Sequence, residues 1–133
     1  MAAGREVGVD VESVRGDVAC AEIAASFFSR REVAALLALP DEARTLAFFT
    51  CWTRKEAYIK PRGAGLSLPL DAFDVSLAPG ELAALLSTRD DEREAARWSL
   101  RELRPGPGYV AAVAAEGGGW RLRCWQWPLD ETK

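Results

Sequence analysis

The stretch DEARTLAFFTCWTRKEAYIK, residues 41–60, predicts a long helix. Asp41 and Glu42 form an acidic first turn, which is favourable at the positive end of a helix dipole. Pro61 follows directly, and proline removes the N–H that a helix needs to continue. We therefore expect the helix to end at about Lys60.

The side chains of this helix fall on a wide apolar face, with two charges inside it. At 3.6 residues per turn, Glu56 lies between Trp52 and Phe49, and Lys60 follows one turn later on the same side. A lone charge is costly in an apolar stripe. Arg54, Lys55 and Tyr58 lie elsewhere on the wheel. The apolar face is formed by Leu46, Phe49, Trp52, Ala57 and Ile59.

A short alternating segment precedes this helix. Residues 6–12 place valines at 7, 9 and 11 against Gly8, Asp10 and Glu12, the pattern of a half-buried strand. Two carboxylates two residues apart leave the same face of a strand, a few ångströms from each other. We expect the valines to face the core and the carboxylates to face outward.

Two interpretations of the charged residues remain open. In the first, Glu56 and Lys60 form a buried i,i+4 ion pair, and Asp10 and Glu12 are ordinary surface acids. In the second, Glu56 meets Asp10 and Glu12 where strand and helix join, and the three share a Mg²⁺ ion. Lys60 then faces the phosphate oxygens of a substrate.

Shorter elements complete an expected α+β fold, with helices early and antiparallel strands late in the chain. A capping box, Ser29 followed by Glu32, predicts a helix start. We expect one domain over residues 1–133, with an antiparallel sheet packed against the long helix and shorter helices. The expected helical segments are 17–28, 33–37 and 81–86; the expected strands are 6–12, 73–77, 97–103, 109–115 and 120–127, with turns at 105–108 and 117–119.

Composition limits the classes of function. The chain has 133 residues and a net charge of −3, which argues against general nucleic-acid binding. It has no histidine, which excludes mechanisms built on an imidazole. Three cysteines without metal-type spacing, and the lack of a signal peptide or membrane span, predict a reduced cytoplasmic protein.

The charge is uneven along the chain. Residues 30–62 hold seven basic and four acidic residues and are therefore net +3, which leaves −6 for the rest. A locally basic region suits an anionic ligand or an acidic partner, although charge alone favours an ordinary solvated helix face. After the helix, Gly63 and Gly65 lie in a turn that lets a ligand approach the backbone. No lysine–serine pair follows them, so this is not a P-loop.

Two motifs together resemble a known family. Val7-Gly8-Val9-Asp10-Val11-Glu12, followed some forty residues later by Phe49-Thr50-Cys51-Trp52-Thr53-Arg54-Lys55-Glu56-Ala57-Tyr58-Ile59-Lys60, is similar to the paired signatures of the 4'-phosphopantetheinyl transferases. The stretches 63–73 and 108–114 look like corresponding parts of the surfactin-synthetase-activating type.

The resemblance implies a reaction and a set of roles. Such enzymes use Mg²⁺ to move the phosphopantetheine arm of coenzyme A onto a serine of an acyl or peptidyl carrier protein. The resemblance implies that Asp10, Glu12 and Glu56 are the metal ligands and that Glu56 is also a candidate base. Lys60 matches the lysine that pairs with the phosphates, and the turn at Gly63 and Gly65 adjoins the ligand.

Carrier proteins are acidic, so the basic region is a plausible docking surface. Arg30, Arg31 and Arg54 are candidate contacts within it, although no motif selects them.

The chain departs from this type by matching only its C-terminal half. The missing half supplies much of the coenzyme A pocket and a histidine. One interpretation is a compact transferase that self-associates, as the short holo-acyl-carrier-protein synthases do; another is a half-enzyme that needs a separate N-terminal half. A third is a module that binds coenzyme A without catalysis, and a Mg²⁺-dependent phosphohydrolase is less favoured. We expect an oligomer with an exposed apolar patch carrying some of the tryptophans.

Overall fold

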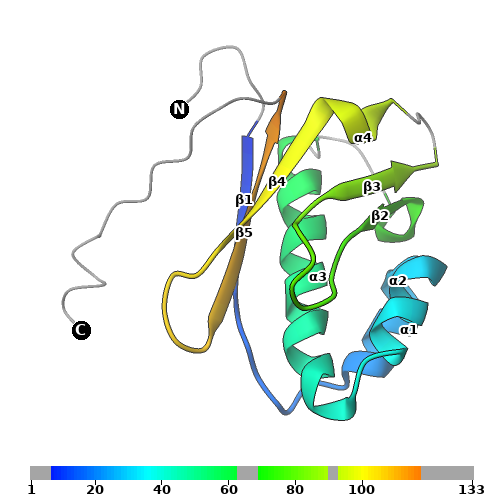
Figure 1. Cartoon of the computed structure of the whole chain (residues 1–133), viewed down its shortest axis with the longest axis vertical. Helices are drawn as coiled ribbons and strands as arrows, with labels where there is room; N and C mark the ends of the chain where they lie inside the picture. Colours follow the sequence, from blue (N-terminus) through cyan, green and yellow to red (C-terminus); the bar gives the residue numbers. More distant parts are fainter. Residues whose placement is uncertain (1–6, 63–68, 90–92, 118–133) are drawn as a thin grey trace.

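One long helix organises the molecule. The computed structural model describes residues 7–62, 69–89 and 93–117. Helix α3 (Asp41–Arg62) runs through the middle, with strands β1, β5 and β4 on one side and β2, β3, α1 and α2 on the other (Figure 1). The mixture of helices and antiparallel strands confirms the α+β prediction.

The larger sheet has three antiparallel strands in the order β1-β5-β4, and the smaller one pairs β2 with β3. The turn between β4 and β5 ends at Gly108, whose φ of 80° is the left-handed conformation that glycine adopts without strain. The strands predicted at 97–103 and 109–115 are confirmed with small changes. The bounds are β1 Val7–Ser13, β2 Phe73–Val75, β3 Leu85–Thr88, β4 Trp98–Leu103 and β5 Tyr109–Glu116.

Strand β1 faces the opposite way from our prediction. Its three valines are 40–51% exposed, whereas Gly8 and Asp10 are buried. The reason is the close approach of α3: a Cβ added to Gly8 would lie 2.0 Å from the carbonyl oxygen of Ala57 and 2.3 Å from Cδ of Pro61. Only the face that carries a glycine can approach the helix so closely.

The outer face of this sheet is also apolar. Cross-strand partners share a face, and the register pairs Val7 with Ala115, Val9 with Val113 and Val11 with Ala111. The valines of β1 and their partners on β5 therefore form an apolar outer face, and apolar character alone does not identify the buried side of β1. We call the exposed side chains of Val7, Val9 and Val11 the valine strip.

Helix α3 is buried on more sides than the wheel predicts. Arg54, Lys55 and Tyr58 were expected off the apolar face, yet they are 2%, 0% and 0% exposed. The helix lies between the two groups of strands, so its second side also faces the interior. The helix continues through Pro61 to Arg62, two residues past the predicted end. Pro61 lies in the last turn, where its missing N–H removes one helical hydrogen bond. Only Arg62 follows it in the helix, so this loss does not interrupt a longer run of hydrogen bonds.

Helices α1 (Cys20–Phe27) and α2 (Arg30–Leu37) form a separate layer beside α3. The capping box is confirmed: the N–H of Glu32 donates to Oγ of Ser29 at 3.2 Å, and the N–H of Ser29 donates to Oε1 of Glu32 at 2.9 Å. This cap starts α2 at Arg30, three residues before the apolar run that suggested it.

The prediction of helical turns over 81–86 is wrong. Leu85–Thr88 is strand β3, and Leu85 is buried. Pairing with β2 overrides the local helical pattern: the N–H of Ser76 donates to Ala84 O at 3.0 Å, and that of Arg89 donates to Ala72 O at 2.9 Å. A short 3₁₀ turn, η1 (Leu70–Ala72), precedes β2, and helix α4 (Glu94–Arg97) leads into β4.

Some predictions lie outside the described residues. These are the strand at 120–127 and most of the turn at 117–119, of which Gly117 is described with a φ of 82°. Within the described ranges, none of the helices is long and apolar enough to cross a membrane.

Candidate active site

Strand β1 and helix α3 bring charged side chains together. Asp10 is 6% exposed, and the Lys60 ammonium lies 2.7 Å from its Oδ1. The same ammonium donates to the carbonyl oxygen of Val9 at 3.1 Å. The second carboxylate oxygen of Asp10, Oδ2, is buried and has no hydrogen-bond partner in the structure. Asp10 thus has one oxygen neutralised by Lys60 and one available to another donor or cation.

Two further carboxylates share this electrostatic environment. Burial raises the pKa of Glu12 to about 7, together with the closeness of Asp10 and repulsion from Asp10 and Glu56. Burial and repulsion from Asp10 also raise the pKa of Glu56, while Lys60 opposes this shift. Like charges raise each other's pKa only when they lie close together. One ammonium therefore faces three carboxylates whose charges repel each other.

This donor set fits a hard divalent cation. Mg²⁺ prefers carboxylate oxygens, and a divalent charge would relieve the repulsion among Asp10, Glu12 and Glu56. In the described part of the chain, no group of three or more His, Cys, Asp or Glu side chains stands in a metal-binding arrangement. The orphaned Oδ2 of Asp10 and the raised pKa values of Glu12 and Glu56 are the features that match a cation.

The first of the two interpretations, an ion pair between Lys60 and Glu56, differs from the contact observed. Lys60 forms its ion pair with Asp10, 50 residues away in sequence, rather than with Glu56 one turn earlier. The expected surface exposure of Asp10 is also wrong, since this face of β1 meets α3. Gly63 and Gly65, the predicted ligand-adjacent glycines, lie outside the described residues.

Our sequence reasoning missed Gly8 as a positioning residue. The absence of its side chain allows β1 to approach α3, and Asp10 follows two residues later on the same face. A single glycine inside an alternating strand is a known sign of close backbone approach, so the signal was present.

A second ion pair, on the far side of α3, was also missed. The Lys55 ammonium lies 2.7 Å from Oε2 of Glu32 and donates to the carbonyl oxygen of Phe73 at 2.6 Å. Oε2 of Glu32 also accepts from the N–H of Val75 at 2.7 Å. This fully buried pair joins α2, α3 and β2, and so fixes the rotation of the helix that carries Glu56 and Lys60.

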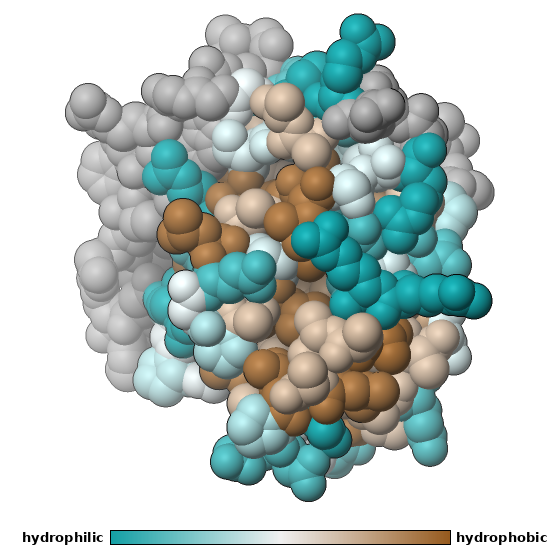
Figure 2. Space-filling view, turned by 45° about the vertical axis from the view of Figure 1, so that its right-hand side comes forward, coloured by the Kyte–Doolittle hydropathy of each residue, from teal (hydrophilic) through white to brown (hydrophobic). Residues whose placement is uncertain are grey.

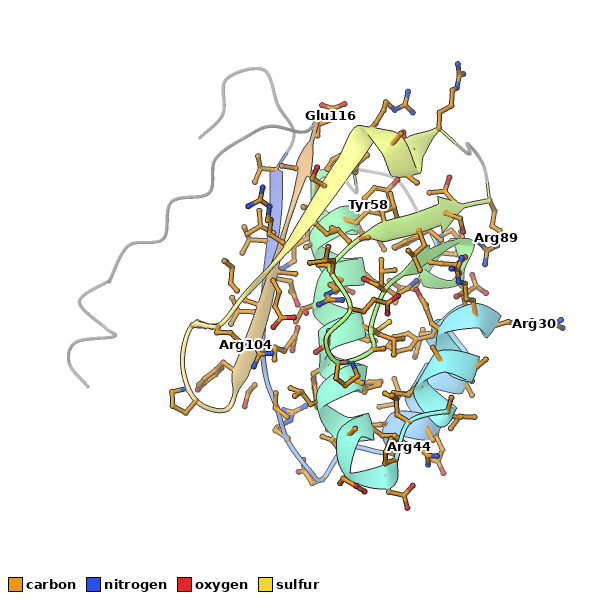
Figure 3. All side chains as sticks on the ribbon, viewed as in Figure 1. Arg30, Arg44, Tyr58, Arg89, Arg104 and Glu116 are labelled. Atoms are coloured by element: carbon orange, nitrogen blue, oxygen red, sulfur yellow. The ribbon has the colours of Figure 1, made fainter. Side chains whose placement is uncertain are left out.

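The basic surface is smaller than expected. Arg54 is buried, and it donates to the carbonyl oxygen of Ser76 at 2.7 Å and to Glu102 at 2.7 Å. It therefore cannot contact a partner protein. Arg30 and Arg31 are exposed, and Figure 3 shows Arg30 extending outward from the end of α2.

Apolar side chains are exposed on the same pair of helices. Phe27 and Leu37 are about half exposed at the ends of α1 and α2. The space-filling view shows hydrophobic atoms gathered over the lower part of this face, with hydrophilic ones around them (Figure 2). We call Phe27, Leu37, Arg30 and Arg31 the helical face. Exposed apolar side chains thus lie here and on the valine strip, whereas Trp98, one of the tryptophans considered for such a patch, is buried.

The sequence as a whole matches a class of transferases. The family model of the 4'-phosphopantetheinyl transferase superfamily matches residues 6–114. The chain belongs to this superfamily, which confirms the resemblance seen in its two motifs.

Individual relatives give the same result. The chain is 39% identical to the 4'-phosphopantetheinyl transferase HetI of Nostoc sp. (strain PCC 7120) over 92% of its length, and 44% identical to Sfp of Bacillus subtilis (strain 168) over 82%. These matches cover 48% and 46% of the two relatives. The chain therefore spans about half the length of the relatives it matches.

Solved structures share the fold. The holo-[acyl-carrier-protein] synthase of Thermotoga maritima superposes with a TM-score of 0.64 at 18% identity, over 84% of this chain and 62% of that one. The synthase of Helicobacter pylori, solved in complex with coenzyme A, gives a TM-score of 0.59 at 16% identity, over 81% and 96%. At these identities the likeness is one of fold.

Proposed function

We propose that this chain carries the metal-binding part of a transferase that moves 4'-phosphopantetheine from coenzyme A to a serine of an acyl or peptidyl carrier protein. The observation that carries the proposal is the buried Asp10 beside Lys60, with one carboxylate oxygen unpartnered. The repulsion that Asp10 exerts on Glu12 and Glu56 supports it. We take residues 1–133 as one transferase-like domain, with the cytoplasm as its location.

The proposed reaction is a phosphoryl transfer. The serine oxygen forms a bond to the phosphorus that carries the pantetheine, and the pyrophosphate P–O bond breaks to release adenosine 3',5'-bisphosphate. The serine proton passes to a base. Mg²⁺ bound by Asp10, Glu12 and Glu56 would neutralise the pyrophosphate charge.

The residues of this chain supply the remaining steps. Glu56 is the candidate base, since burial and Asp10 raise its pKa and so make it a better proton acceptor than an ordinary carboxylate. Lys60, half exposed at the end of α3, can pair with the phosphates. Gly63 and Gly65 remain the proposed backbone contacts to the substrate.

We assign the carrier protein to the helical face. Its exposed arginines suit an acidic partner, and its exposed apolar side chains, Phe27 and Leu37, suit a partner with an apolar patch. Charge reversal of Arg30 and Arg31 to glutamate should raise the KM for the carrier and leave the affinity for coenzyme A unchanged.

A transfer assay tests the reaction. The chain is incubated with coenzyme A, Mg²⁺ and an apo carrier protein, and mass spectrometry records whether the carrier gains the phosphopantetheine mass. Glu56→Gln is the matched negative control, because it keeps the size of the side chain and removes its charge. Transfer that is equally fast with Glu56→Gln would contradict the assignment of Glu56.

A second candidate is a half-enzyme or coenzyme A-binding module that needs another subunit. It is favoured by the match to half of each relative and by the valine strip, an exposed apolar surface of the kind that oligomers bury. Adding a separately made N-terminal half of a relative should then start transfer. Transfer by the chain alone supports self-association, and light scattering should give a multiple of 14.5 kDa.

A further inference from the structure

The contacts of Lys60 suggest a role besides binding phosphate. Its ammonium group lies 2.7 Å from Oδ1 of Asp10 and donates to the carbonyl oxygen of Val9. Asp10 is one of the carboxylates that we propose for the cation. The lysine and the cation therefore require the same carboxylate group.

We propose that Lys60 is an internal competitor of the divalent cation. It neutralises Asp10 while no cation is bound, and the cation displaces it so that its ammonium can reach the substrate phosphates. This inference rests on the proposed function, because it requires a cation held by Asp10.

Burial indicates which partner moves. The side chain of Asp10 is 7% exposed and held on a paired strand, whereas that of Lys60 is 50% exposed. Lysine has a flexible four-carbon stem, so it can leave the carboxylate by rotating into solvent. Asp10 has a shorter, buried side chain and therefore less room to move.

Electrostatics gives the direction of the effect. Lys60 opposes the raised pKa values of both Glu12 and Glu56, so its positive charge acts on all three carboxylates. A divalent cation at the same carboxylates would be repelled by an ammonium that stayed within a few ångströms. Removal of the lysine should therefore tighten cation binding, although it weakens binding of the phosphates.

The test measures cation affinity without coenzyme A. Mn²⁺ is the probe, and electron paramagnetic resonance reports the free ion. We compare the unaltered chain with Lys60→Met, which keeps the stem and removes the charge, and with Lys60→Gln as a second neutral variant. Arg31→Met is the matched control, since it removes one positive charge from the exposed surface of α2.

We expect the two neutral Lys60 variants to bind Mn²⁺ about tenfold more tightly, and Arg31→Met to change the affinity less than twofold. Lys60→Arg should retain the affinity of the unaltered chain. A thermal melt adds a second readout: saturating Mg²⁺ should raise the midpoint of Lys60→Met more than that of the unaltered chain.

Equal Mn²⁺ affinity in the unaltered chain and both neutral variants would overturn the competition and leave the metal assignment standing. Failure of all of these proteins to bind Mn²⁺ would overturn the metal assignment itself, and the inference with it.

Discussion

Helix α3 carries two lysines five residues apart, and each ammonium lies 2.7 Å from a carboxylate oxygen. Lys55 and its partner Glu32 are 0% and 1% exposed, whereas Lys60 is half exposed beside a buried Asp10. The inner pair has two further hydrogen bonds to β2, and the outer pair has an adjoining carboxylate oxygen without a partner. An ion pair of the same length is thus structural at Lys55 and, in our proposal, can be replaced by a cation at Lys60. Burial, not distance, distinguishes them.

The largest effect is expected at the inner pair. Lys55→Met leaves the Glu32 carboxylate buried without its counter-ion, and breaking a buried pair in this way lowers the free energy of unfolding by about 3–5 kcal/mol. Lys60→Met should lower it by about 1 kcal/mol or less, since solvent reaches the lysine. Urea denaturation of both variants measures the difference. Similar losses from the two substitutions would remove the distinction drawn between the pairs.

Gly8→Ala should affect the outer pair more than the inner one. The added methyl would overlap the Ala57 carbonyl, so β1 must shift, at a cost of about 1–3 kcal/mol. The shift moves Asp10, which should weaken Mn²⁺ binding as well. Gly16→Ala is the control, because a Cβ there meets no atom within 4 Å. Unchanged stability and Mn²⁺ affinity in Gly8→Ala would show that β1 is not held by this contact.

Glu56→Gln should separate ligand binding from folding. It removes one of the proposed cation ligands and relieves the repulsion from Asp10. We expect loss of Mg²⁺-dependent coenzyme A binding in calorimetry, with little change in the free energy of unfolding. The exposed Glu42→Gln, in the first turn of the same helix, is the control. Unchanged coenzyme A binding in Glu56→Gln would contradict the metal assignment.

The smallest effect is a dependence of stability on pH. The pKa of Glu12 is about 7 in the folded protein and 4.5 for an unperturbed glutamate. Between these pH values the folded state therefore binds more protons than the unfolded state. Without Mg²⁺, this carboxyl should therefore lower stability as the pH rises from about 4.5 to 7. The stabilisation by Mg²⁺ should increase over the same range, because the cation needs the ionised carboxylate.

Thermal melts across this range, with and without Mg²⁺, measure the two trends. Glu12→Gln isolates the contribution of this carboxyl from those of other acids. Identical pH profiles for this variant and the unaltered chain would contradict the raised pKa.

The sequence predicted the α+β class, the long helix and the capping box, because periodicity and end signals are local. It also selected Asp10, Glu12, Glu56 and Lys60, which the structure places at one strand–helix junction; their roles remain predictions. It misplaced the faces of β1 and α3, where burial is set by contacts between distant segments. Alternation placed the valine face of β1 inward, whereas the face with Gly8 and Asp10 meets the helix because only a glycine fits against it. A single wheel likewise cannot describe a helix that is covered on two sides.

Two residues at the contact of β1 with α3, Gly8 and Pro61, each lack a group that other residues have. Gly8 has no side chain, and Pro61 has no N–H to bond the Ala57 carbonyl that Gly8 faces. The two positions are 53 residues apart in sequence, yet a change at one alters what the other can be. In a double-mutant cycle, Pro61→Ala should recover part of the cost of Gly8→Ala by removing the nearby ring carbon. We therefore expect the effects of substitutions at positions 8 and 61 to depend on each other.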